Sequence, residues 1–119
     1  MNPNFQDFAA LRSLMFQPTA GQVYADVSGE LAILDSNQGI YYGLDPVGAR
    51  IWSLILEFKT AAEIRSILLE EYDVEAFQLD CDITQLLTEL FSKGLIEVAN
   101  EQDKARHVHE SAHGSWLSR

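Results

Sequence analysis

Three short segments rich in Val, Ile, Leu and Tyr follow one another in the first half of the chain, which is typical of β-strands. They span residues 22–27, 30–35 and 40–44. Ser28-Gly29 joins the first pair as a tight hairpin, and a four-residue turn ending at Gly39 joins the second pair, because glycine readily takes a positive φ. The pattern predicts a three-stranded antiparallel meander with two outer edges, and each edge exposes backbone donors and acceptors.

Apolar residues then recur at helical spacing, which predicts two helices directly after the strands. Asp45 is the expected N-cap of the first helix and Pro46 its first residue, where a missing N–H has no cost. Thr60 and Glu63 form a capping box for the second helix, which runs to about Tyr72. The expected apolar stripes are Val47, Ile51, Leu54 and Phe58 in the first helix, and Ile64, Ile67, Leu68 and Tyr72 in the second.

A third helix is predicted over about residues 76–93, with Gly94 as its C-terminal stop and residues 95–98 as a short closing strand. Its inward-facing residues are expected to be Leu79, Ile83, Leu86, Leu87 and Leu90. Three strands followed by three helices predict an α+β fold, a winged-helix-turn-helix-like domain with a three-stranded antiparallel sheet.

The two ends of the chain lack this clear pattern. Residues 1–19 are expected to form an N-terminal extension, and residues 20–99 the domain itself. The polar tail from residue 100 to 119 has no sustained period, so it is expected to be disordered. Apolar side chains in the extension favour an amphipathic helical turn or two against the domain: Phe5, Phe8, Leu11 or Arg12, and Met15.

The composition limits the classes of partner. With 119 residues, 47% apolar and 22% charged, the chain matches one globular domain. Its net charge of −10 disfavours nucleic acids and anionic membrane surfaces, whereas a basic peptide would be steered toward it. The segment from Glu70 to Asp82 carries six acids and neither Lys nor Arg, so the start of the third helix would repel DNA phosphates.

The sequence also favours a cytoplasmic location. Apolar runs are far shorter than the ~20 residues that cross a bilayer, and the N-terminus lacks the basic start and cleavage site of a secretory signal. Cys81 is the single cysteine, which excludes an internal disulfide and agrees with a reducing compartment.

No residue pattern indicates catalysis, a cofactor or a metal site. Cys81 sits among carboxylates that oppose thiolate formation, far in sequence from any histidine, and is expected to be a small, partly buried helix residue. Asp80 and Asp82 lack the spacing and central glycine of a calcium loop. The pattern H-x-H-x3-H of the tail is interpreted as solvent-exposed histidines without supporting partners: His107, His109 and His113.

A linked series of short motifs between residues 22 and 98 resembles the PqqD-like family of RiPP recognition elements, which act on ribosomally made and later modified peptides. The motifs are Gly29–Asp35, Gly39–Asp45, Val47–Trp52, Thr60–Ile64, Tyr72–Val74 and Gly94–Ile96. The resemblance implies a small winged-helix domain without catalysis of its own. Such a domain holds the leader part of a precursor peptide for a modifying enzyme, such as a protease, a cyclase or a radical enzyme, in lasso-peptide or pyrroloquinoline-quinone pathways.

In this family the leader is an added β-strand beside the third strand, in a cleft between that strand and the third helix. The corresponding edge here is Gly39, Ile40, Tyr41, Tyr42, Gly43 and Leu44. Alternate strand residues share a face, so one of the sets Ile40/Tyr42/Leu44 and Tyr41/Gly43 must pack inward. The expected cleft-lining flank of the third helix is Phe77, Cys81, Thr84, Thr88 and Phe91, with the alternative that these side chains complete the core. Asp80 and Asp82 are expected to attract a basic leader.

Two other functions remain open from the residues alone. A winged-helix transcription regulator would need a basic face that this chain does not show. In a structural homodimer, the exposed strand edge of one copy would pair with the same edge of a second copy. With the family resemblance added, the prediction is a leader-peptide-binding protein, a monomer or weak homodimer, without cofactors.

Overall fold

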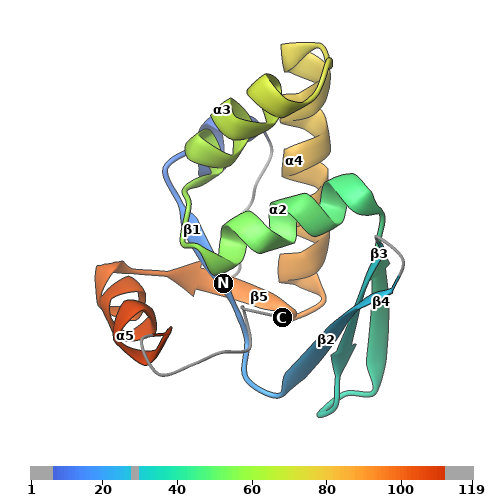
Figure 1. Ribbon diagram of the computed structural model, residues 1–119, viewed down its shortest axis with the longest axis vertical. Coiled ribbons are helices and arrows are strands. Elements are labelled where there is room, and N and C mark those ends of the chain that lie inside the picture. Colours follow the sequence, from blue (N-terminus) through green and yellow to red (C-terminus); the bar gives the residue numbers. More distant parts are fainter. Residues whose placement is uncertain (1–6, 28–29, 112–119) are drawn as a thin grey trace.

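The computed structural model describes residues 7–27 and 30–111, and in this part of the chain helices and strands are arranged around one core (Figure 1). The order is α1 (Phe8–Leu11), β1 (Met15–Pro18), β2 (Gln22–Val27), β3 (Glu30–Asp35), β4 (Ile40–Leu44), α2 (Pro46–Leu56), α3 (Ala61–Glu71), α4 (Ala76–Ser92), β5 (Ile96–Ala99) and α5 (Glu101–Ser111). The predicted α+β class, with a three-stranded sheet followed by three helices, is confirmed.

The three predicted strands form one antiparallel sheet in the order β2-β3-β4. The turn between β3 and β4 is organised by Asp35, which is buried at 2% exposure. Its carboxylate accepts hydrogen bonds from the backbone N–H of Asn37 at 3.0 Å and from Nε2 of Gln38 at 2.9 Å. Gly39 has a φ of 71°, as the turn requires. The hairpin predicted at Ser28-Gly29 lies outside the described residues.

The predicted helix starts are confirmed in detail. Asp45 caps α2 by accepting a hydrogen bond from the N–H of Gly48 at 2.8 Å. Thr60 and Glu63 cap α3 with two reciprocal side-chain to backbone bonds of 3.1 and 2.8 Å. Gly94 follows α4 with a φ of 76°, the left-handed conformation that ends many helices.

The apolar stripe expected on α2 is wrong at both ends. Val47 is 37% exposed, because it lies in the first turn on the side away from the core. The helix stops at Leu56, and Phe58 takes a left-handed φ of 60°. This turn directs the Phe58 side chain into a small buried cluster with Met15 and Ala99. Burial of the ring offsets the cost of about 1–3 kcal/mol for a non-glycine residue in this region.

The N-terminal segment confirms one expected helical turn against the domain and differs from the prediction beyond it. Among the described residues one N-terminal turn, α1, is helical, and Phe5 lies outside the described residues. Met15 begins strand β1, which pairs antiparallel with β5 from Met15↔Ala99 to Pro18↔Ile96. The backbone N–H groups of Ala61 and Ala62 donate to the carbonyls of Leu14 and Arg12 at 3.0 and 2.8 Å. Residues 12–18 are thus built into the domain and do not form a separate extension.

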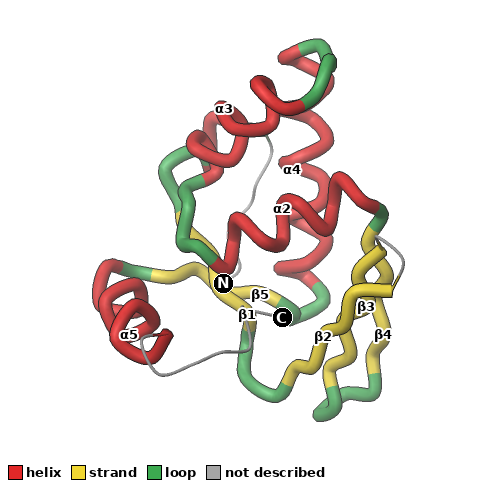
Figure 2. The backbone as a smooth tube through the Cα atoms, viewed as in Figure 1, coloured by secondary structure: helices red, strands yellow, loops and turns green. Residues whose placement is uncertain are grey.

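The C-terminal tail also differs from the expected disorder over residues 101–111, which form α5 beside β5 (Figure 2). Asn100 and Asp103 exchange side-chain to backbone hydrogen bonds of 3.0 and 2.8 Å at the helix start. Arg106 adds an ion pair to Asp103 at 3.1 Å. Capping and charge pairs support this helix without an apolar period, so hydrophobic periodicity does not detect it. Residues 112–119 lie outside the described residues.

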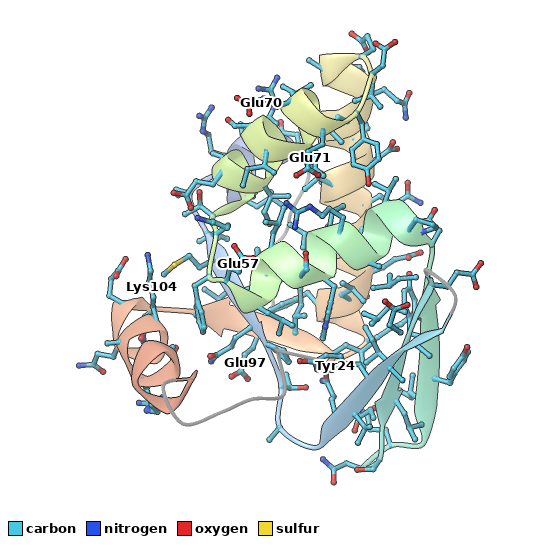
Figure 3. All side chains as sticks on the ribbon, viewed as in Figure 1. Tyr24, Glu57, Glu70, Glu71, Glu97 and Lys104 are labelled. Atoms are coloured by element: carbon cyan, nitrogen blue, oxygen red, sulfur yellow. The ribbon has the colours of Figure 1, made fainter. Side chains whose placement is uncertain are left out.

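The core lies between the inner face of the three-stranded sheet, the β1–β5 pair and helices α2, α3 and α4. Trp52 of α2 is 2% exposed and meets Tyr24 of β2 edge-on, with ring centroids 5.6 Å apart and an interplanar angle of 72° (Tyr24 is labelled in Figure 3). This contact anchors α2 to the sheet. None of the helices in the described ranges has the length and apolar character that crossing a membrane requires.

Candidate functional site

Strand β4 lies at one end of the three-stranded sheet and, among the described residues, pairs only with β3. Leu44 is buried and Ile40 and Tyr42 are partly buried, whereas Tyr41 is 69% exposed and Gly43 is exposed. The set Ile40/Tyr42/Leu44 therefore packs inward, which settles the alternation that the sequence left open. The outer side of β4 offers backbone N–H and C=O groups to an additional extended chain.

Tyr42 connects β4 to the second half of α4. Its hydroxyl donates a hydrogen bond to a carboxylate oxygen of Glu89, and the ammonium of Lys93 lies 5.8 Å from the centre of its ring. Burial, followed by the hydrogen bond and the negative charge of Glu89, raises the pKa of Tyr42 to about 12. The phenol is therefore neutral at physiological pH and acts as a hydrogen-bond donor.

A cavity of about 620 Å³ extends along α4 from Glu89 toward the N-terminal end of this helix, with α1 as its opposite wall. We call it the α1–α4 groove. Its lining residues are Asp7, Phe8 and Ala9 from the start of the described chain, and Phe77, Asp80, Cys81, Thr84, Gln85, Thr88 and Glu89 from α4. Glu89 both lines the α1–α4 groove and binds Tyr42, so the groove begins next to the open edge of β4.

The structure brings most of the predicted helix flank together. Phe77, Cys81, Thr84 and Thr88 line the α1–α4 groove, and Phe77 is 71% exposed. Phe91 does not line it and instead packs, partly buried, against the core. These positions are therefore suited to contact a guest, and their role in binding remains a prediction.

Cys81 is exposed, which corrects the expectation that it is partly buried. It lies two residues from both Leu79 and Ile83, which corresponds to about 200° around the helix from each of these core positions. Its side chain consequently faces the α1–α4 groove and not the core.

Two threonine hydroxyls in the wall of the α1–α4 groove are notable for their hydrogen bonding. The Oγ1 atoms of Thr84 and Thr88 are buried and have no hydrogen-bond partner among the described residues. Buried polar atoms without partners are rare in proteins, and functional sites are one of the places where they occur.

Asp80 has a partner that the sequence did not reveal. Its carboxylate forms an ion pair with Arg65 of α3, and the guanidinium lies 5.9 Å from the centre of the Phe8 ring. Asp82 is exposed and accepts a hydrogen bond from Nε2 of Gln78 at 3.0 Å. The charge of Asp80 is balanced within the fold, which makes Asp82 the better candidate for attracting a basic guest.

Sequence reasoning missed several residues of this site. Gln85 and Glu89 lie on α4 one position beyond Thr84 and Thr88, so the helical spacing of the predicted flank already contained a signal for them. Phe8 was expected to pack against the domain, but nothing in the sequence indicated that it lines the same cavity as residues 70 positions away. Among the described residues, no group of three or more His, Cys, Asp or Glu side chains could hold a metal ion.

Comparisons with known proteins give a consistent result. TbiB1, whose structure is solved in complex with the TbiA(beta) leader peptide, is 36% identical in sequence to this chain, with a TM-score of 0.64. The match covers 68% of this chain and 94% of TbiB1. A lasso peptide synthetase B1, complexed with its leader peptide, is 27% identical with a TM-score of 0.65, over 69% of this chain and 96% of that protein.

No curated protein sequence matches the chain significantly. The sequence model of one family, described as coenzyme PQQ synthesis protein D (PqqD), matches residues 30–96, a range that contains β3, β4, α2, α3 and α4. The resemblance inferred from the short motifs is thereby confirmed, and the chain belongs to the PqqD family.

Proposed function

We propose that this chain is a non-catalytic leader-peptide-binding protein that captures a ribosomally made precursor peptide by β-strand addition and presents it to a modifying enzyme. The observation that carries the proposal is the open edge of β4 beside the α1–α4 groove. Strand addition separates two tasks, because backbone hydrogen bonds supply affinity and side-chain pockets supply selectivity. Here β4 provides the first and the face of α4 the second.

The relatives support the same reading. TbiB1 and the lasso peptide synthetase B1 are both solved with a leader peptide, and each is covered almost completely by this chain. Of the lasso-peptide and pyrroloquinoline-quinone alternatives, the likeness to the lasso peptide synthetase B1 favours the lasso-peptide type.

A modifying enzyme is the second partner in the proposal, and the outer face of the three-stranded sheet is the surface that suits it. Val23, Leu34 and Tyr41 are directly paired across β2, β3 and β4 and are 61%, 43% and 69% exposed. Because Tyr41 belongs to the edge strand, this apolar row is continuous with the surface that a bound peptide would present. An enzyme that contacts the row would lie beside the peptide it modifies.

Fluorescence anisotropy with a labelled TbiA(beta) leader peptide and its scrambled version tests the proposed binding. A displayed library of randomised 15-residue peptides, selected against the same chain, provides a second probe that does not depend on the relative's leader. We expect saturable binding of the leader or of a selected peptide and none of the scrambled one. If neither kind of peptide binds, the proposal is wrong.

Light scattering of the same samples distinguishes a receptor from a structural homodimer. For a peptide receptor, the molar mass should increase only by the mass of the bound peptide. A dimer held together by two β4 edges would dissociate as the peptide displaces the partner copy, and a dimer that persists without binding peptide would contradict the receptor.

A further inference from the structure

One wall of the α1–α4 groove is made by a segment outside the region that matches the family model. That region covers residues 30–96, whereas α1 spans Phe8–Leu11. Phe8 is partly buried against the core, and it lines the same cavity as Phe77, which is 71% exposed on the first turn of α4. The end of the groove farthest from β4 therefore has an aromatic side chain on each wall.

The position of α1 is held by a specific set of contacts. Arg65 of α3 forms an ion pair with Asp80 of α4, and its guanidinium also packs over the ring of Phe8 at 5.9 Å. At the other end of α1, Leu11 is fully buried in the core. The side chain of Phe8 is thus placed by α3, α4 and the core together, and is not a loose terminal residue.

The distance between this aromatic end and β4 follows from helix geometry. Thr88 and Phe77 are eleven residues apart on α4, which corresponds to roughly 16 Å along the axis. An extended peptide advances about 3.3 Å per residue, so it covers that distance in roughly five residues. β4 and α4 run in opposite directions here, since Gln38 lies beside Gly94 and Tyr42 binds Glu89. A guest strand antiparallel to β4 would place these five residues on its N-terminal side.

We propose that α1 is a specificity wall of this protein, and that Phe8 and Phe77 form a subsite for one large apolar side chain of the guest peptide. The anchor side chain lies roughly five residues from the peptide residue that sits beside Tyr42. This inference rests on the proposed peptide binding and adds a residue preference to it. Phe8 and Phe77 both line this cavity. An apolar peptide side chain placed between the two rings would remove apolar surface of both from water, and this burial would favour binding.

The experiment uses the peptide that binds with the highest affinity in the anisotropy measurements. Each of its residues is replaced in turn by alanine, and binding is measured to the unchanged chain and to Phe8→Ala, Phe8→Leu and Val98→Ala. Val98 is a matched control, because it is also an exposed apolar side chain, 41% exposed on β5 and outside the groove.

We expect one large apolar peptide residue whose replacement weakens binding roughly tenfold to the unchanged chain. For Phe8→Ala, the original peptide should bind roughly tenfold more weakly, and the same alanine replacement should then have little further effect. Phe8→Leu should retain most of the affinity, and Val98→Ala should behave as the unchanged chain. Non-additive losses of this kind identify two groups in contact.

Thermal unfolding of each variant and two-dimensional NMR keep the test decisive. If Phe8→Ala loses stability, the amide signals of Ala9 and Ala10 in the unchanged chain still report on the subsite. The chemical shifts of these two amides should change when the original peptide binds, and should not change when the peptide without the anchor residue binds. Additive losses, or a Phe8→Ala variant with unchanged selectivity, would overturn the subsite while peptide binding to β4 stands. Failure of every peptide to bind would instead remove the proposed function itself.

Discussion

The two sheets of this protein differ in how far apart in the sequence their strands lie and in whether an edge is left open. The three-stranded sheet is built from neighbouring segments joined by short turns, and it leaves the edge of β4 open. The two-stranded sheet joins β1 and β5, whose paired residues Met15 and Ala99 are 84 positions apart in the sequence. Strands close in sequence leave an edge that is open to the proposed peptide, whereas strands distant in sequence pair with each other inside the fold.

The difference is also visible in what the side chains of each sheet do. In the two-stranded sheet Phe16 and Ile96 are almost fully buried in the core. In the three-stranded sheet the outer face keeps Val23, Leu34 and Tyr41 exposed. We therefore expect substitutions of buried residues in the two-stranded sheet to change the stability of the fold, and substitutions on the three-stranded sheet to change peptide binding.

Phe16→Ala should have the largest effect, because it removes a ring that is 1% exposed and leaves a cavity. We expect a loss of about 3–5 kcal/mol in the free energy of unfolding, measured by urea denaturation. Gln17→Ala is the matched control on the same strand, since the Gln17 side chain makes an exposed hydrogen bond to Glu97 at 2.9 Å and one to Asp103, and does not belong to the core. Equal losses for the two variants would show that the β1–β5 pair does not close the core.

Peptide backbone substitution tests the open edge of β4. Proline removes the N–H of a residue, so at each hydrogen-bonded position of a bound peptide it should weaken binding roughly tenfold more than alanine does. The effect should alternate along the peptide, because only every second residue of an added strand faces the β4 edge with its backbone groups. A flat profile, measured by anisotropy, would argue against strand addition.

Tyr42→Phe should have a smaller effect that depends on pH. The hydroxyl bond to Glu89 contributes on the order of 1 kcal/mol to stability. Because the pKa of Tyr42 is raised to about 12 from 10.0, this contribution is fully present below pH 10 and is lost as the pH rises through 12.

Urea denaturation at pH 8 and at successive pH values above 10 measures this dependence. The difference in free energy of unfolding between the unchanged chain and Tyr42→Phe should decrease across that range. Tyr41→Phe is the control, since its side chain is 69% exposed on the opposite face of the same strand. An advantage that is constant with pH would contradict the assigned hydrogen bond.

Salt should produce the smallest effect. The acidic residues are spread over several elements, as Glu57, Glu70, Glu71 and Glu97 in Figure 3 illustrate, so a basic peptide is attracted by the whole surface. Raising the salt concentration from 50 to 300 mM should slow association of a basic peptide roughly threefold, measured by stopped-flow fluorescence, with little change in dissociation. An association rate indifferent to salt would remove electrostatic steering.

The single cysteine provides a direct readout of the same site. Cys81 is exposed in the α1–α4 groove, so a bound peptide should slow its alkylation by iodoacetamide, measured by mass spectrometry. Thr84 and Thr88 are close along the helix but unreactive, which makes the signal specific to one position. Unchanged alkylation under saturating peptide would place the guest elsewhere.

Much of the fold could be predicted because its signals are local. Strands β2 to β4, the Asp45 and Thr60 caps and the stop at Gly94 depend on residues within a few positions of one another. The shared flank of Phe77, Cys81, Thr84 and Thr88 on α4 followed from helical spacing, and the family resemblance suggested that it lines a cleft. The ion pair of Asp80 with Arg65, the bond of Tyr42 to Glu89 and the position of Phe8 could not be predicted, because each joins segments separated by many residues.

The sequence by itself determined strands β2 to β4, helices α2 to α4, the acidic surface and the family, since periodicity, caps, turns and motifs are properties of adjacent residues. Only the tertiary structure decided that residues 15–18 pair with residues 96–99, which face of β4 packs inward, and that α1 is a wall of the groove. The physical reason is that pairing and burial between distant segments depend on how the whole chain fills one core.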